Sequence, residues 1–255
     1  MDFYAMKENV PHGEVRERWY FSKITGKWRH AHVYTPPDYD TKARARYSVL
    51  YLQHGAGENV RGWVEQDRAT VILDNLIAEK KAKPMILVVD TSYASFATNA
   101  VGTNRSAPTA AFEEVMLKEL IPLIDSTYRT LDDRKNRAMP GLSMGSGQTL
   151  NIKLRHLDKF AWIGAMSGPP RQGFEVETAY DVVFNNASAF NKRVKLLWFG
   201  AGTAEERIYT STTAMHEALD RASIKNVFYS SPGTDHEWQT WRRSLHDFAP
   251  RLFQD

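Results

Sequence analysis

A five-residue segment, Gly141-Leu142-Ser143-Met144-Gly145, matches the pattern G-x-S-x-G. In this pattern a strand ends, the chain turns sharply and a helix begins, so that the serine hydroxyl is exposed on the turn. The two glycines are needed because the backbone passes close to its neighbours, where a Cβ would collide. Ser143 is therefore the candidate nucleophile, and it needs an adjacent base that is oriented by a third group.

The base can be sought among the eight histidines of the chain. After a strand-turn-helix nucleophile, the acid and then the histidine follow in the sequence, each in a loop after a strand. His236 is the one histidine that lies in an expected loop after Ser143. The others lie before the serine or on expected helices: His12, His30, His32, His54, His156, His216 and His246. His236 is the candidate base.

The acid is expected after the apolar run that ends near Phe199, where residues 200–206 read GAGTAEE. Glu205 and Glu206 are both candidates, and a carboxylate in the first turn of a helix also interacts favourably with the helix dipole. That second role accounts for one of the two. We favour Glu205 as the acid and keep Glu206 as the alternative. Asp181 and Asp220 are weaker candidates, since one lies in a long insertion and the other on an expected helix.

A serine nucleophile that attacks a carbonyl group also needs backbone N–H groups directed at the oxyanion that forms during the reaction. Met144, directly after the nucleophile, is positioned to supply one of them. The second is expected from a loop after an early strand, and residues 54–57, which read HGAG, fit that description. Ala56 is the candidate donor in this loop.

The pattern of expected strands and helices predicts the fold that positions these candidate site residues. Apolar runs typical of buried strands occur at 47–53, 85–90, 136–140, 160–166, 194–199 and 226–230, and segments with helical spacing at 67–81, 109–127, 145–157, 205–222 and 238–253. A β-prone hairpin is expected at 14–22 and 28–35. This alternation predicts an α/β fold with a mostly parallel central sheet covered by helices on both faces. In such folds ligands bind beyond the carboxyl ends of the strands.

Two segments and one residue do not follow this alternation. Residues 91–107 and 167–193 show no readable element, and loops of such length usually shape a functional cleft. Pro140 lies immediately before the nucleophile motif. Because proline has no N–H to donate to a sheet, the strand is expected to end at or before it.

Composition limits the class of protein. The 255 residues predict a single catalytic domain over 1–255, with 1–10 as an N-terminal arm. The net charge is only +3 and the basic residues are scattered, so a nucleic-acid partner is not expected. There is no cysteine, which excludes disulfides and thiolate chemistry. No apolar run approaches the ~18 residues of a membrane span, and no secretory signal is visible in this chain.

Several segments together carry a family resemblance: YLQHGAG at 51–57, GW at 62–63, GLSMG at 141–145, GTAE at 202–205 and TDHEW at 234–238. They resemble the esterase D-like α/β-hydrolases and, within these, carbohydrate esterase family 1, the feruloyl and acetylxylan esterases. The likeness extends to PHGEV at 11–15 and PPDY at 36–39. It covers nearly the whole chain.

The resemblance implies an α/β-hydrolase fold, with Ser143 as nucleophile, His236 as base, Glu205 as acid, and Ala56 and Met144 as oxyanion donors. It also implies a secreted or periplasmic enzyme. The chain departs from the family pattern in two places. Many relatives carry aspartate where Glu205 stands, and the more usual pair of glycines after Ser-Met is here Gly145 followed by a serine.

The function expected from this resemblance is that of a serine esterase without a metal or organic cofactor. It would release hydroxycinnamate, such as ferulate, from feruloylated or acetylated xylan or oligosaccharide through an acyl-enzyme. An aromatic acid needs an apolar surface on which to stack. Trp63, Phe96 and Trp238 are the candidates for that surface, whereas Trp198 and Trp241 are expected in the core.

Other functions fit the same residues. An acetylxylan esterase, an S-formylglutathione hydrolase-like small-ester hydrolase and an acyltransferase would all use the same triad. A catalytically silent carbohydrate-binding α/β-hydrolase is an alternative of another class. The complete order of serine, acid and histidine argues against a silent protein.

Overall fold

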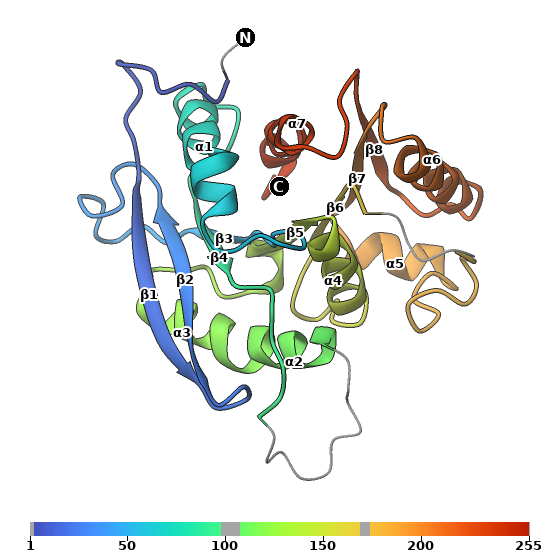
Figure 1. Ribbon diagram of the computed structural model, residues 1–255, viewed down its shortest axis with the longest axis horizontal. Helices are drawn as coiled ribbons and strands as arrows, with labels where there is room; N and C mark the ends of the chain where they lie inside the picture. The colour runs from blue at the N-terminus through green and yellow to red at the C-terminus, as the bar shows by residue number, and fades with distance from the viewer. Residues whose placement is uncertain (1–2, 98–107, 169–173, 255) are drawn as a thin grey trace.

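The computed structural model describes residues 3–97, 108–168 and 174–254 (Figure 1). Its sheet has the strand order β1-β2-β4-β3-β5-β6-β7-β8. The strands are β1 (Glu14–Ser22), β2 (Lys27–Thr35), β3 (Ser48–Tyr51), β4 (Met85–Asp90), β5 (Arg137–Leu142), β6 (Trp162–Met166), β7 (Leu196–Gly202) and β8 (Val227–Ser231). β1 and β2 form an antiparallel hairpin, β2 pairs antiparallel with β4, and the remaining pairs are parallel. The predicted mostly parallel sheet and its N-terminal hairpin are confirmed.

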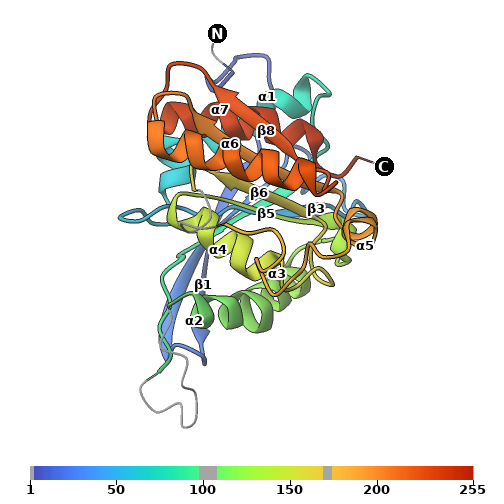
Figure 2. The ribbon, with the colours of Figure 1, turned by 90° about the vertical axis from the view of Figure 1, so that its right-hand side faces the viewer.

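Helices cover both faces of this sheet, as the alternation predicted. They are α1 (Ala69–Ala78), α2 (Pro108–Val115), α3 (Ile121–Thr127), α4 (Met144–Lys153), α5 (Ala187–Arg193), α6 (Glu206–Arg221) and α7 (Trp238–Phe248). Figure 2 shows α1 and α7 above the strands β5 and β6, with α3 and α4 below them. The short helical segments are η1 (Gly62–Gln66), η2 (Met116–Leu120), η3 (Arg134–Asn136) and η4 (Ala249–Arg251).

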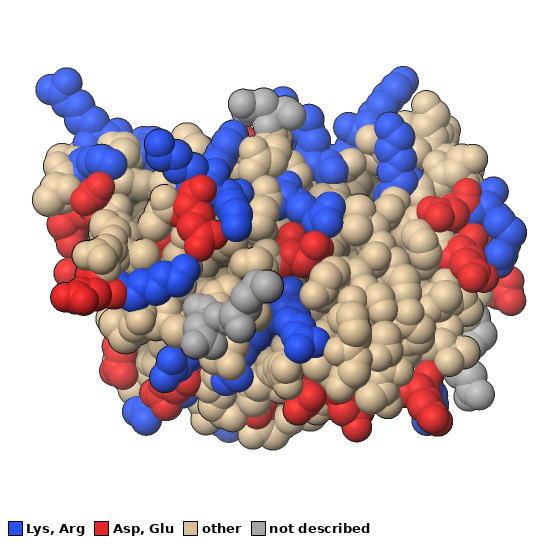
Figure 3. Space-filling view, turned by 90° about the horizontal axis from the view of Figure 1, so that it is seen from above, with Lys and Arg blue, Asp and Glu red and all other residues tan. Residues whose placement is uncertain are grey.

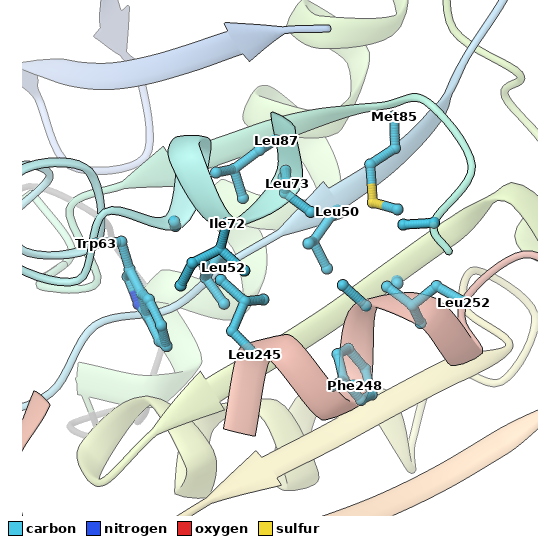
Figure 4. Packing of buried hydrophobic residues seen from close by; sticks show 14 of the residues in the cluster. Leu50, Leu52, Trp63, Ile72, Leu73, Met85, Leu87, Leu245, Phe248 and Leu252 are labelled. Carbon is cyan, nitrogen blue, oxygen red and sulfur yellow. The ribbon is translucent and has the colours of Figure 1, made fainter. Parts of the chain in front are cut away.

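Alternate side chains of the central strands fill two separate layers of core. Leu50 and Leu52 point to the face that packs against α1 and α7, together with Ile72 and Phe248 (Figure 4). Tyr51, between them in the chain, points to the opposite face and packs against α2 and α3. This follows from the two-residue period of a strand. Both layers are buried and apolar, so the sheet is a rigid support for the loops at its carboxyl edge.

The expectation that the strand ends at or before Pro140 is wrong. Pro140 lies inside β5, in register with Gly164 of β6. Its carbonyl accepts a hydrogen bond from the Gln53 N–H on the other side, 3.0 Å away. In a parallel sheet the N–H and C=O of one residue point to the same neighbouring strand. The N–H that Pro140 lacks would therefore point toward the same side as its carbonyl. That position lies beyond Leu50–Ala138, the last pair of the β3–β5 ladder. The Gln53–Gly141 bridge continues the same register after this point. The missing N–H of proline therefore falls in the interruption of the ladder between Ala138 and Gly141.

Two helical features also differ from expectation. The helix expected over 109–127 forms, but η2 gives its middle a π-helical turn. Pro122 of α3 cannot donate to the preceding turn, and a π-helical widening accommodates such an interruption. The long stretch 167–193, in which no element was readable, contains α5.

Hydrogen bonds from Arg242 to two backbone carbonyls hold α7 against the segment before α1. The Arg242 guanidinium donates from Nε to the Asp67 carbonyl oxygen over 3.2 Å, and from Nη2 to the Gln66 carbonyl. The Asp67 side chain is fully buried, and both of its carboxylate oxygens lack a hydrogen-bond partner among the described residues. Burial raises the pKa of this carboxyl well above its usual range, and the charge of Arg242 opposes the rise.

We expect Asp67→Asn to remove a pH dependence of stability. A carboxyl whose pKa is raised on folding keeps its proton in the folded state after the unfolded chain has lost it. Stability therefore falls as the pH rises above about 4 in the parent protein, by about 1.4 kcal/mol for each pH unit between the two pKa values. Urea denaturation from about pH 4 to about pH 8 should show this fall in the parent and not in the variant. Asp158→Asn, at an exposed carboxylate, is the control, and a parallel fall in Asp67→Asn contradicts the assignment.

Candidate active site

Ser143 stands between the end of β5 and the start of α4, with φ +50° and ψ −115°. This backbone conformation is rare for a residue with a Cβ and is strained. It is held by a hydrogen bond from the Ser143 N–H to the Met166 carbonyl of β6, over 2.8 Å. The strand-turn-helix context that the G-x-S-x-G pattern predicts is therefore present.

The two glycines of the motif are required by close backbone contacts. A Cβ on Gly141 would lie 2.3 Å from the Gly145 carbonyl oxygen. A Cβ on Gly145 would lie 2.6 Å from the His54 carbonyl oxygen and 2.8 Å from the Gln53 Cβ. All three distances are under 3.0 Å, which real Cβ contacts essentially never show. The nucleophile turn is thus pressed against the segment that leads into the HGAG loop.

The structure brings Ser143, His236 and Glu205 into one hydrogen-bonded chain. His236 Nε2 lies 3.0 Å from the Ser143 Oγ, and His236 Nδ1 lies 2.6 Å from the Glu205 Oε1. Because a carboxylate can only accept, Nδ1 carries the proton and Nε2 accepts from the serine hydroxyl. Glu205 is buried, whereas Glu206 is exposed in the first turn of α6. Of the two acids that sequence reasoning left open, Glu205 is the one beside His236.

The second oxygen of Glu205 is also fully engaged. Its Oε2 accepts from the Gly202 N–H over 2.6 Å and from the Ser167 hydroxyl over 2.8 Å. The Ser167 hydroxyl in turn accepts from the Trp241 indole N–H over 3.0 Å. These donors fix the carboxylate that faces His236. Sequence reasoning missed Ser167, whose only signal is its position at the end of an apolar run. It predicted Trp241 as a core residue, and Trp241 is buried.

The HGAG loop lies against the nucleophile. A Cβ on Gly55 would lie 2.6 Å from the Leu142 Cδ1 and 3.4 Å from the Ser143 Cβ. Ala56, the next residue, is exposed at this surface. Met144 is the first residue of α4, so its N–H has no acceptor within that helix. The structure thus places both predicted oxyanion donors in segments that adjoin Ser143.

His54 holds this loop to the end of β4. Its ring Nε2 accepts from the Ser92 N–H over 3.0 Å, and its Nδ1 donates to the Gly55 carbonyl over 2.8 Å. Burial lowers the pKa of His54 below its ordinary value, which favours the neutral tautomer that these two bonds require. The Tyr93 hydroxyl accepts from the Gly57 N–H over 2.6 Å. Sequence reasoning missed Ser92 and Tyr93, because both lie in a stretch without periodicity.

The three aromatic residues predicted to line the cleft differ in their surroundings. Trp63 has no exposed surface, and its indole N–H donates to the Gln53 carbonyl over 3.0 Å. It supports the core and offers no face for stacking, so this part of the expectation is wrong. Trp238 is half-buried beside Trp63, with ring centroids 5.6 Å apart. Phe96 is half-buried against the core layer that includes α2 and α3.

The surface and the helices bear on other kinds of partner. On the face seen in Figure 3, Lys and Arg side chains are interspersed with Asp and Glu. In the part of the chain that the structure describes, no helix is long and apolar enough to cross a membrane.

The sheet is mostly parallel, and a serine stands on a strained turn between a strand and a helix. An acid and a histidine follow the serine in the chain, the histidine contacts the serine, and the acid contacts the histidine. These features define an α/β-hydrolase. A family model described as "Putative esterase" matches residues 22–252. The chain belongs to this esterase family, and its fold is that of carbohydrate esterase family 1.

Known proteins of three sources illustrate the similarity. An endo-1,4-beta-xylanase/feruloyl esterase of Xylanibacter ruminicola is 38% identical over 258 residues, covering 99% of this chain and 33% of that protein. The chain thus spans about a third of the length of this relative. A CE1 ferulic acid esterase of Anaeromyces mucronatus, solved with ferulic acid, superposes with a TM-score of 0.79 at 23% identity, covering 98% of this chain and 94% of the other. A feruloyl esterase module of Clostridium thermocellum, complexed with sinapinate, gives 0.81 at 22% identity, covering 99% and 91%.

We expect Gly141→Ala and Gly147→Ala to have opposite effects. The Cβ at position 141 meets the Gly145 backbone, which cannot move aside, so the variant should lose about 1–3 kcal/mol of stability and much of its esterase activity. A Cβ at position 147, inside α4, meets nothing within 4 Å, so alanine there should stabilise by about 0.5–1 kcal/mol. Urea denaturation and kcat/KM on one ester measure both effects. Equal stability and activity in the two variants would contradict the close contact.

Proposed function

We propose that this chain is a feruloyl esterase, which hydrolyses hydroxycinnamate esters of plant cell-wall polysaccharide through an acyl-enzyme. The observation that carries the proposal is the hydrogen-bonded series from Ser143 through His236 to Glu205. The choice of substrate is supported by the 38% identity to a relative whose name includes feruloyl esterase.

Acylation begins when the Ser143 Oγ attacks the ester carbonyl while His236 Nε2 takes the hydroxyl proton. Glu205 keeps the imidazole in the required tautomer and stabilises the imidazolium that forms. The oxyanion is bound by the N–H groups of Ala56 and Met144, which supply the electrostatic stabilisation that such a site requires. His236 then gives its proton to the departing sugar oxygen, which leaves as an alcohol.

Deacylation repeats these steps with water as the nucleophile. His236 takes a proton from the water as its oxygen attacks the acyl carbonyl, and the same two N–H groups bind the second oxyanion. The Ser143 Oγ leaves and recovers its proton from His236. The products of this second half of the reaction are ferulic acid and the free enzyme.

Recognition of the phenyl ring of the acid requires an apolar surface near the serine. We propose Trp238 for this role, because it is half-buried and lies two positions after His236 in the chain. Its ring is held edge-on by Trp241, with centroids 5.0 Å apart and planes at 88°. Phe96 stays a second candidate. A polymeric substrate further suggests that the enzyme acts outside the cell.

The proposal is tested by a comparison of substrates and by removal of the nucleophile. We expect a higher kcat/KM for methyl ferulate than for release of acetate from acetylated xylan or hydrolysis of S-formylglutathione. Ser143→Ala should lower kcat by at least ~10³-fold and abolish labelling by a fluorophosphonate. A preference for acetate or for the thioester would overturn the substrate, and hydrolysis that survives in Ser143→Ala would overturn the mechanism.

The two adjacent glutamates provide a matched pair of variants. Glu205→Gln replaces the acceptor of the His236 Nδ1 proton, and we expect kcat to fall about 10³–10⁴-fold as it does when a triad acid becomes an amide. Glu206→Gln changes an exposed side chain and should leave kcat/KM close to that of the parent. A large loss in Glu206→Gln with activity retained in Glu205→Gln would show that the acid had been assigned to the wrong residue.

A further inference from the structure

The N-terminal hairpin carries a cluster of two histidines and one carboxylate, away from the Ser143 site. Glu17 of β1 is directly opposite His32 of β2 in the antiparallel register, and His30 is opposite Trp19. Opposite residues of an antiparallel pair share a face, as do residues two apart on one strand. Glu17, His30 and His32 therefore point to the same side of the sheet. Their potential ligand atoms all lie within 4.8 Å of one another.

Three buried ring nitrogens in this cluster lack hydrogen-bond partners among the described residues. His32 is 5% exposed, and neither its Nδ1 nor its Nε2 bonds to any described residue. The buried Nε2 of His30 is also unpaired within the described chain. The Glu17 oxygens lie 3.7 Å from the His30 Nε2 and 3.6 Å from the His32 Nε2. These distances are too long for hydrogen bonds, and buried polar atoms without partners are costly.

We propose that Glu17, His30 and His32 bind a divalent transition-metal ion, with Zn²⁺ as the best fit. Two imidazoles and one carboxylate are a ligand set that Zn²⁺ accepts, and a fourth position remains for water. Around a tetrahedral zinc with bonds of about 2.0–2.1 Å, ligand atoms are about 3.3 Å apart. The Glu17 oxygens, at 3.6 and 3.7 Å from the two Nε2 atoms, need only a small inward movement, which this exposed side chain can make. The histidine nitrogens, which lie within 4.8 Å of the other candidate ligand atoms, complete the approach by rotation of their rings.

The surroundings support neutral, oriented ligands. Burial lowers the pKa of His32, the charges of His30 and Arg61 act in the same direction, and Glu17 opposes them. A neutral imidazole is the form that coordinates a metal. The Trp19 ring stacks on His30 with centroids 4.4 Å apart and planes at 8°, which fixes the plane of the imidazole. A bound ion would link β1 to β2 across the open edge of the sheet, and so stabilise the hairpin.

The test measures zinc binding directly and does not depend on esterase activity. The full chain is freed of metal with a chelator, and ZnCl₂ is titrated by calorimetry and by thermal unfolding. We expect saturable binding at one site whose affinity is at least about tenfold weaker in Glu17→Gln and in His30→Gln. The Tm should rise with zinc in the parent and not in these two variants. NiCl₂ should quench the fluorescence of Trp19, measured as the difference between the parent and Trp19→Phe.

Controls separate this site from adventitious binding. Glu14→Gln changes another exposed carboxylate of β1, bonded to Arg16, and His216→Gln changes a half-buried histidine elsewhere. Both should keep the zinc affinity and the rise in Tm. The Tm of each metal-free variant shows whether it folds. Absence of saturable zinc binding in the folded parent, or parental affinity in either Glu17→Gln or His30→Gln, overturns the proposal.

Discussion

Close backbone packing around Ser143 is the constraint on which the rest of the site depends. Gly141 and Gly145 allow the end of β5 and the start of α4 to touch each other, and Gly145 also touches the carbonyl of His54. That second contact presses the nucleophile turn against the HGAG loop. One steric condition therefore strains the serine backbone, exposes its hydroxyl and brings the second oxyanion segment beside it.

The N-terminal hairpin contributes to the same site at a distance. The buried Arg29 of β2 bonds to Asp90 at the end of β4 over 2.6 Å and to the Tyr93 carbonyl over 2.9 Å. The segment between those two residues carries Ser92, whose N–H holds the ring of His54. A buried pair of this kind is a fixed anchor, because breaking it leaves an uncompensated charge. The hairpin is thus tied to the loop that adjoins the nucleophile.

Much of this arrangement could be predicted from local pattern. The G-x-S-x-G spacing identifies the turn at Ser143, because few residue types tolerate such a close approach. The order of elements then singles out His236, since one histidine follows the serine in a loop. Periodicity found the strands and most helices. It failed at Pro140, which lies at an interruption of the β3–β5 ladder. Such an interruption depends on how two strands pair, and the sequence of one strand does not show it.

What the sequence by itself determined is the type of chemistry, since residue identity, order along the chain and steric tolerance are local properties. Tertiary structure alone decided which partner each group meets. It turned Glu205 to His236 and left Glu206 in solvent, and it buried Trp63. It also set Glu17 beside His30 and His32 through the register of β1 on β2. Such contacts depend on how distant segments pack against one another, and the spacing of residues along the sequence does not determine that packing.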